Sequence, residues 1–181
     1  FGKLSKMKFD ALSIVVNSPG GSPVQSSLIA QKIREICNKK KIKCYCFIED
    51  VAASGGYWLA CSADEIYADI NSIVGSIGVI SGGFGFTELI KKIGVERRIF
   101  TAGDNKSFLD PFEKVNKKDE TKLKNLQKQI HQNFIDWVQS RRKRKIKEKD
   151  IKTVFSGSFW LSSQAKELGL IDGISNETSF F

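Results

Sequence analysis

The feature that most constrains this chain is a run in which a buried strand, a tight turn and a helix follow one another. Residues 44–48 are apolar and predict a buried strand, residues 52–56 are all small, and residues 57–60 are compatible with a helix. A serine at such a corner has its hydroxyl pushed out of the backbone, with the helix amides behind it aimed at whatever the hydroxyl attacks. Ser54 is therefore the candidate nucleophile. The alternative interpretation is that the small residues only let a helix pack closely on a sheet.

A second glycine-rich turn precedes this one in the chain. Residues 11–17 predict a short buried strand, residues 18–21 (Ser, Pro, Gly, Gly) end it, and residues 22–38 have the capping box, the early proline and the apolar stripe of a helix. Strand–helix–strand units build a parallel sheet by right-handed crossovers and place the following turns at the carboxyl edge of that sheet. We therefore expect Gly20 and Gly21 to lie near Ser54.

The remaining elements complete an α/β fold, a mainly parallel sheet of βαβ units flanked by helices. Further strands are expected at residues 43–48, 65–68, 75–80 and 95–101, and further helices at residues 87–93 and 119–140. The length of 181 residues suits a single domain over residues 1–181. Because only about ten residues precede the first strand, we expect an upstream part to be missing, and no run approaches the ~18 apolar residues of a membrane span.

The net charge of +9 is unevenly distributed. A basic cluster, residues 141–149, lies at the end of the long predicted helix and contains seven Lys or Arg residues: Arg141, Arg142, Lys143, Arg144, Lys145, Lys147 and Lys149. The first interpretation is a solvated helix end, where cations interact favourably with the helix dipole. An anionic membrane surface is the second, and nucleic acid is not expected, because no aromatic residues interleave with the cluster.

The four cysteines point to a buried core rather than to a cofactor. Cys37, Cys44, Cys46 and Cys61 lie in apolar surroundings, which favours reduced core thiols over a disulfide framework. No histidine accompanies Cys44 and Cys46 at the spacing of metal ligands, so we expect neither a metal nor any other cofactor.

A serine nucleophile needs a base within hydrogen-bond reach. The one histidine, His131, lies on the flank of the long predicted helix and is interpreted as a surface or structural residue. A lysine made neutral by burial is the other base that works near neutral pH. Lys106 is the candidate, because it stands apart from the charged clusters and is followed by Phe108, Leu109, Pro111 and Phe112, which could cover it.

Several motifs together resemble one family. Residues 17–21 (Asn-Ser-Pro-Gly-Gly), residues 51–57 (Val-Ala-Ala-Ser-Gly-Gly-Tyr) and residues 75–79 (Gly-Ser-Ile-Gly-Val) are similar to the signature of the signal peptide peptidase A and protease IV family, serine peptidases of the ClpP/crotonase fold with a Ser-Lys dyad. The resemblance continues through Gly103, Lys106 and Pro111 and through residues 165–172, so it covers nearly the whole chain.

The resemblance implies a role for each matching residue. Ser54 matches the nucleophile, Lys106 the general base and Ser76 a serine that orients the lysine. The amides of Gly21 and Gly55 match the oxyanion hole. The glycine-rich segment, with Gly75, Ile77, Gly78 and Val79, would pair with an extended substrate as an added strand.

The resemblance also implies partners and a location. Peptide substrates such as cleaved signal peptides, a ring-like homo-oligomer and association with a bacterial membrane are expected, with an N-terminal strand, helix and possible membrane anchor absent from this chain. Ser158 stands where the family commonly has an arginine, which we expect to alter a subunit contact without touching a catalytic role.

Two other functions are weighed against the peptidase. A catalytically silent peptide-binding or scaffold member would keep the fold without turnover, and the apparent dyad argues against it. An acyl-CoA hydratase or isomerase of the same fold would need acidic residues beside the glycine turns, and no obvious pair is present.

Overall fold

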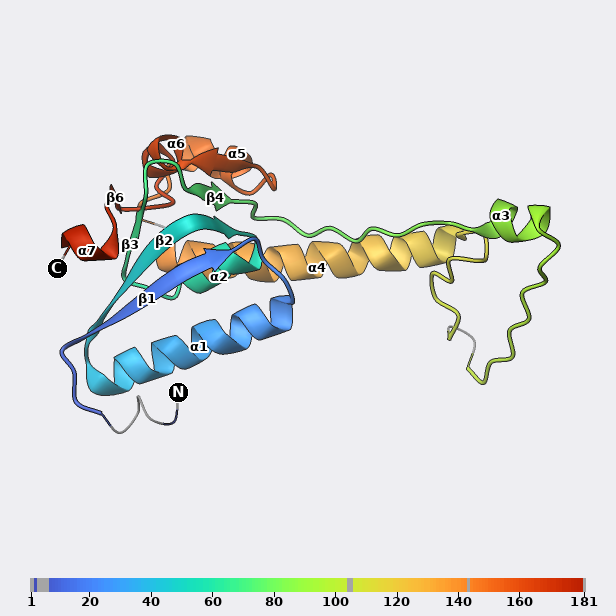
Figure 1. Cartoon of the computed structure of the whole chain (residues 1–181), viewed down its shortest axis with the longest axis horizontal. Helices are drawn as coiled ribbons and strands as arrows, with labels where there is room; N and C mark the ends of the chain where they lie inside the picture. Colours follow the sequence, from blue (N-terminus) through green and yellow to red (C-terminus); the bar gives the residue numbers. More distant parts are fainter. Residues whose placement is uncertain (1, 3–6, 104–105, 143, 181) are drawn as a thin grey trace. The chain divides into compact units, whose positions relative to one another are not determined.

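The computed structural model describes residues 2, 7–103, 106–142 and 144–180 and has the expected α/β architecture (Figure 1). The elements, in chain order, are β1 (Ala11–Ser18), α1 (Pro23–Lys40), β2 (Lys43–Ala53), α2 (Gly55–Ala60), β3 (Glu65–Ala68), β4 (Ile73–Gly75), α3 (Thr87–Lys92), α4 (Lys117–Arg142), η1 (Glu148–Asp150), α5 (Ile151–Val154), β5 (Phe159–Leu161), α6 (Ser162–Glu167), β6 (Gly173–Ile174) and α7 (Glu177–Phe180). Two compact units divide the chain: unit 1 is Phe1–Val79 with Ile130–Phe181, and unit 2 is Ile80–Gln129. The prediction of one peptidase domain over residues 1–181 stays a prediction.

Strand β2 is the centre of the sheet in unit 1 (Figure 1). It pairs with β1 along one edge, and with β3 and then β4 along the other, all in parallel; β6 extends the sheet beyond β3. The pair β4–β5 is antiparallel. Because β1 and β2 run parallel, with a helix between them, the turns that follow both strands lie at the same edge, as the sequence predicts.

Helix α1 begins as the sequence predicts. The Ser22 side chain accepts a hydrogen bond from the Gln25 amide, and Pro23 is the first helical residue. The helix ends at Lys40, two residues later than expected, and Lys41 closes it in the left-handed conformation. Its buried face, which includes Ile33 and Cys37, packs into the core that also holds the buried residues of β2.

Three predicted strands differ from the structure. Strand β2 continues to Ala53 instead of ending at Ile48, because Val51, Ala52 and Ala53 pair with β4. The strand predicted over residues 75–80 is wrong: β4 is Ile73–Gly75, and Gly75 and Ser76 have φ angles of 121° and 53°, which break the ladder. Residues 95–101 form no strand, and only three of these seven residues are apolar.

Unit 2 contains α3 and the part of α4 before residue 130, and it exposes many large apolar side chains. Eight large apolar residues among the described part of the unit are more than a third exposed: Ile80, Phe84, Leu89, Ile93, Val95, Phe100, Val115 and Leu126. Its internal order comes from local contacts, such as the Phe86 amide donating to the Pro111 carbonyl at 2.7 Å and Arg97 pairing with Asp110 at 2.9 Å. An exposed apolar surface of this kind is typical of a segment that another protein surface covers.

The four cysteines are buried free thiols, as predicted. Burial raises the pKa values of Cys44 and Cys61 to about 12, so both remain protonated near neutral pH. Within the described ranges no group of His, Cys, Asp and Glu side chains is arranged to hold a metal ion. None of the helices in the described ranges combines the length and the apolar character needed to cross a membrane.

Candidate active site

Ser54 occupies a strained corner between β2 and α2. Its φ and ψ angles are 51° and −121°, a conformation that residues with a side chain rarely adopt. The corner is held at both ends, because the Ser54 amide donates to the Gly75 carbonyl at 2.9 Å and the Ser54 carbonyl accepts from the Trp58 amide at 3.0 Å. The side chain is half-buried and makes no capping hydrogen bond to α2. A strained serine between a strand and a helix has the geometry of a nucleophile elbow.

The turn after β1 lies directly against this corner, as the sequence predicts. A Cβ atom added to Gly20 would lie 2.8 Å from Ser54 Cβ, and one added to Gly55 would lie 3.3 Å from the Gly21 amide nitrogen. Both turns therefore need glycine in order to approach so closely. In the part of the chain that the structure describes, the amides of Gly21 and Gly55 have no acceptor within the protein, so both are available to a ligand.

The segment after β4 runs beside the same corner. The hydrogen bond from the Ser54 amide to Gly75 places Ser76 one residue beyond a direct contact of the nucleophile candidate. Ser76 is half-buried, and its amide donates to the Ser158 carbonyl at 2.7 Å. This bond uses the backbone of Ser158, so the expectation that its side chain alters only a subunit contact stays a prediction. Its side chain bonds instead to Ser156.

Lys106 belongs to unit 2, whereas Ser54, Ser76 and the two glycines predicted to form the oxyanion hole belong to unit 1. Contrary to the expectation from the sequence, Lys106 is exposed. The aromatic residues expected to cover it have other contacts. Phe112 packs against Phe86 at a ring separation of 5.5 Å, and Phe108 lies under the ammonium group of Lys122 at 5.2 Å.

His131 has a contact that agrees with a structural role. Its Nε2 is 2.9 Å from the Ile77 carbonyl oxygen and therefore carries the proton that it donates. The bond ties α4 to the segment with Gly75, Ile77, Gly78 and Val79, the predicted substrate strand.

Two buried contacts, which local sequence patterns do not predict, join α2 and α4 to residues 169–172. The Tyr57 hydroxyl donates to the Leu170 carbonyl at 2.7 Å. Arg142, whose side chain is 1% exposed, donates to Asp172 at 2.7 Å and to the Gly169 carbonyl. Burial by itself would raise the pKa of Asp172, but the hydrogen bonds and charges of Arg142 and Lys145 outweigh it and hold that pKa below its usual value.

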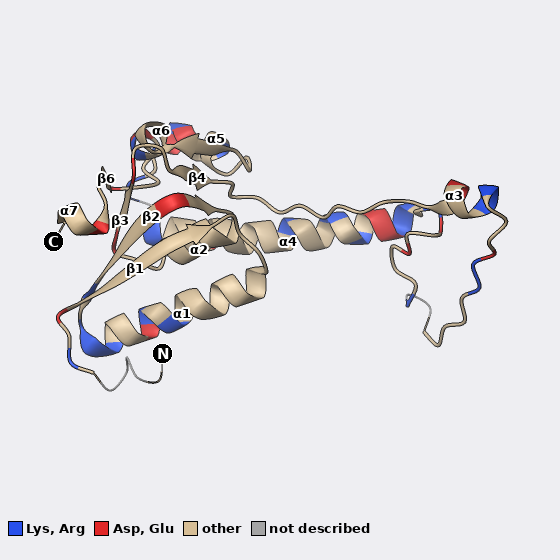
Figure 2. Ribbon diagram, in the orientation of Figure 1, with Lys and Arg blue, Asp and Glu red and all other residues tan. Residues whose placement is uncertain are grey.

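Three described residues of the basic cluster have partners within the folded structure. Arg141 donates to the carbonyls of Cys61 and Ala63 and pairs with Asp64, Arg142 is buried, and Lys145 pairs with Asp172. Lys143 lies outside the described residues, while Arg144, Lys147 and Lys149 are exposed. Figure 2 shows further Lys and Arg residues at the end of α1 and along α4, so positive charge is not confined to the cluster. Arg141, Arg142 and Lys145 are therefore bound within the folded structure rather than part of a free cationic surface.

A strained serine at a strand-to-helix corner, with two backbone amides beside it that have no acceptor among the described residues, is typical of α/β hydrolytic proteins that use an oxyanion hole. The chain belongs to peptidase family S49, whose family model matches residues 36–180. The resemblance to the signal peptide peptidase A family and the expected ClpP/crotonase-like fold are thereby confirmed.

Three relatives are all longer than the matched region, and two of them carry protease or peptidase names. The chain is 54% identical over 170 residues to a Brucella melitensis protein named Na(+)/H(+) antiporter NhaA, in a match that covers 94% of the chain and 23% of that protein. It is 33% identical over 164 residues to a putative protease of Methanocaldococcus jannaschii, covering 91% of the chain and 51% of the relative. It is 31% identical over 159 residues to the putative signal peptide peptidase SppA of Enterococcus faecium, covering 88% and 45%. The chain thus spans between about a quarter and a half of these proteins.

Proposed function

We propose that the chain is the catalytic part of a serine endopeptidase that hydrolyses extended apolar peptides, such as cleaved signal peptides, through an acyl-enzyme on Ser54. Lys106 accepts the proton of the Ser54 hydroxyl while the oxygen attacks the scissile carbonyl carbon. The amides of Gly21 and Gly55 stabilise the oxyanion, and Lys106 passes the proton to the leaving amine. Lys106 then removes a proton from the water that hydrolyses the ester.

The observation that carries this proposal is the corner at Ser54. Strain of this kind persists only where the surrounding structure imposes it, and it clusters at active sites. Here the Ser54 side chain makes no capping hydrogen bond to α2 and lines one small cavity with Gly21 and Gly55, whose amides have no acceptor among the described residues. The substrate binds as an extended strand along Gly75, Ile77, Gly78 and Val79, with Ser76 orienting the lysine.

The exposure of Lys106 sets a condition on this mechanism. A lysine works as a general base near neutral pH only when apolar surroundings favour its neutral form. Since the loop of Lys106 leaves it exposed, a second surface has to cover it in the active enzyme. We propose that a ring-like homo-oligomer supplies that surface, which is consistent with the eight exposed apolar side chains of unit 2.

A fluorophosphonate probe tests the catalytic residues. We expect the probe to label Ser54 in the unchanged protein and to leave the Ser54→Ala variant unlabelled. In the Lys106→Ala variant the labelling rate should fall by at least about two orders of magnitude. Lys114→Ala is the matched control, because Lys114 is another exposed lysine of unit 2, and its labelling should equal that of the unchanged protein. Labelling that survives Lys106→Ala at full rate would exclude Lys106 as the base.

Assembly and location are tested separately. Light scattering on the complete protein should give the mass of a multimer, and Phe84→Ser with Phe100→Ser should reduce that mass, since both side chains are more than 80% exposed. A monomer that cleaves peptides would contradict the assembly. For the proposed bacterial membrane association, the assembled protein should sediment with anionic vesicles and stay in solution with neutral ones.

The exposure of Lys106 also favours a second candidate, a catalytically silent protein that binds peptides through the same groove. Such a protein would bind extended peptides at the residue 75–79 segment but would release no cleaved product and would not react with the probe. Product release by the assembled protein, abolished by Ser54→Ala, would exclude this candidate.

A further inference from the structure

A very small cavity lies beside Ser54 in unit 1. Its volume is about 20 Å³, room for roughly one water molecule or one methyl group. Gly21, Ser54 and Gly55 line one side of it, and these are the residues proposed to hold the reacting carbonyl. Gly78 and Val79, from the proposed substrate-binding segment, also line it. A peptide bound along that segment, with its carbonyl at Ser54, would therefore direct one side chain into this cavity.

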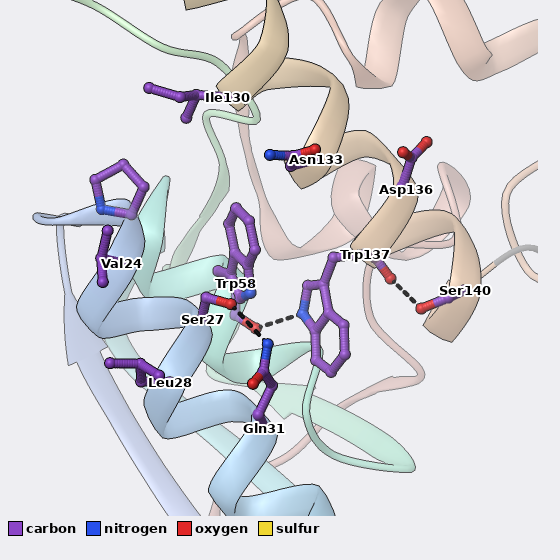
Figure 3. A pocket seen from close by; sticks show the side chains of 11 residues that line it. Val24, Ser27, Leu28, Gln31, Trp58, Ile130, Asn133, Asp136, Trp137 and Ser140 are labelled. Atoms are coloured by element: carbon purple, nitrogen blue, oxygen red, sulfur yellow. Dashed lines mark hydrogen bonds between the residues drawn. The ribbon is translucent and has the colours of Figure 1, made fainter.

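Trp58 is the wall that keeps the cavity small. It lies one helical turn after Ser54, is 7% exposed and stacks on Phe134 with ring centroids 4.7 Å apart. On its other side a groove of about 720 Å³ runs between α1 and α4, and Pro23, Trp58 and Ile130 line both spaces. Figure 3 shows Trp58 between the α1 residues Ser27 and Leu28 and the α4 residues Asn133 and Trp137.

The wall is held from both sides. The Trp58 carbonyl accepts a hydrogen bond from the Trp137 indole at 2.9 Å, and the Trp58 amide donates to Ser54. With its backbone bonded at both ends and its ring stacked on Phe134, the indole cannot swing aside without breaking packed contacts. The small size of the cavity is thus a property of the folded unit.

We propose that Trp58 is a specificity-determining residue, which restricts the substrate side chain on the acyl side of the scissile bond to glycine, alanine or serine. The inference rests on the proposed function, because it takes Ser54 as the nucleophile. An alanine methyl group fits a cavity of about 20 Å³, whereas a phenyl ring needs roughly 150 Å³. Larger side chains do not fit the cavity while Trp58 separates it from the groove.

Two peptidyl phosphonate probes test this assignment, with the same sequence except for alanine or phenylalanine at the reactive position. The measured quantity is the ratio of their labelling rate constants at Ser54 in one sample of assembled protein, so that the active fraction cancels. We expect the alanine probe to react at least about tenfold faster in the unchanged protein. Trp58→Ala joins the cavity to the groove and should lower the ratio by about tenfold or more, while Trp58→Phe should lower it less.

Two further variants complete the design. Because Trp58 is almost fully buried, its truncation threatens the fold, and Ile130→Ala opens the same wall from α4 with a smaller loss of packing. Val15→Ala removes a half-exposed apolar group of β1 that lines neither space, and its ratio should equal that of the unchanged protein.

The outcomes separate this inference from the proposed function. If neither phosphonate nor the small fluorophosphonate labels Ser54, the proposed function falls and the role of Trp58 falls with it. If the fluorophosphonate labels Ser54 but the phenylalanine probe reacts as fast as the alanine probe, only the role of Trp58 is overturned. An unchanged ratio in both Trp58→Ala and Ile130→Ala would also overturn it.

Discussion

The strain at Ser54 can be measured by comparing glycine with alanine at that position. A side chain held at φ 51° and ψ −121° costs about 1–3 kcal/mol, which glycine does not pay and alanine does. Glycine in turn lowers the free energy of unfolding by about 0.5–1 kcal/mol relative to alanine, because it has greater conformational freedom in the unfolded chain. Ser54→Gly should therefore be more stable than Ser54→Ala by about 0.5–2 kcal/mol, although both variants lose the nucleophile.

Ser13 is the matched reference, because it is a half-buried serine within the regular strand β1. Its hydroxyl donates to Glu177, and both substitutions remove that bond equally. At Ser13 the order should reverse, with Ser13→Gly less stable than Ser13→Ala by about 0.5–1 kcal/mol. The difference between the two comparisons, about 1–3 kcal/mol, is then the strain itself.

Urea unfolding followed by tryptophan fluorescence is the suitable assay. All three tryptophans, Trp58, Trp137 and Trp160, lie in unit 1, so their signal reports the unit that carries Ser54. The same difference should appear as a shift in Tm of roughly 2–4 °C for each kcal/mol. If Ser54→Gly is less stable than Ser54→Ala by the same amount as at Ser13, the corner is not strained and the argument for a nucleophile elbow loses its physical basis.

Three further predictions use the same assay. Gly56→Ala places a methyl group 2.3 Å from the Ser18 carbonyl oxygen and should destabilise unit 1 by about 1–3 kcal/mol; a neutral effect would show that the two turns separate easily. Arg142→Ala leaves Asp172 without its buried partner and should cost about 3–5 kcal/mol, whereas exposed Arg144→Ala should stay within about 0.5 kcal/mol, and equal effects would contradict the buried pair. Because the pKa of Asp172 is lower in the folded protein, its contribution is complete above the unfolded value of about 3.9 and is lost as the pH falls through the folded value, so Asp172→Asn should flatten the fall in Tm between pH 5 and pH 2.

The ends of helices and strands were predicted well where the local sequence contains turn or capping residues. Residues 18–23 contain turn residues, a capping serine and an N-terminal proline, so the end of β1 and the start of α1 were predicted within one residue. The nearness of Gly20 and Gly21 to Ser54 followed from the parallel pairing of two consecutive strands, which places the turns after them at one edge of the sheet.

Pairing between distant segments explains the errors in strand prediction. Residues 51–53 look like part of a turn because they are small, but β4 offers them a partner and they remain in β2. Residues 95–101 contain β-branched and aromatic residues typical of a strand, yet in the described structure no strand pairs with them. A strand depends on its neighbour in the sheet, and a periodic pattern cannot supply that neighbour.

The exposure of Lys106 could not be predicted from the sequence, because it also depends on contacts between side chains. Apolar residues that follow a lysine predict burial only if their side chains turn toward it, whereas Phe112 packs with Phe86 and Phe108 with Lys122. The roles of Trp58 and Arg142 were missed because each depends on a partner more than 25 positions away. Patterns within one element do not report such contacts.

The corner at Ser54 combines strain with close packing, and each requires the other. A strained residue stays in place only if its neighbours resist relaxation, and here Gly20 and Gly56 lack the Cβ atoms that would hold the turns apart. Helix α2 then anchors the corner through buried Tyr57 and Trp58. The tryptophan that walls off the cavity therefore also supports the conformation of the serine, so truncating it should lower the labelling rate for small probes while raising the relative rate for large ones. If Trp58→Ala changed the ratio of the two rates without slowing the alanine probe, Trp58 would limit the size of the cavity but would not support the conformation of Ser54.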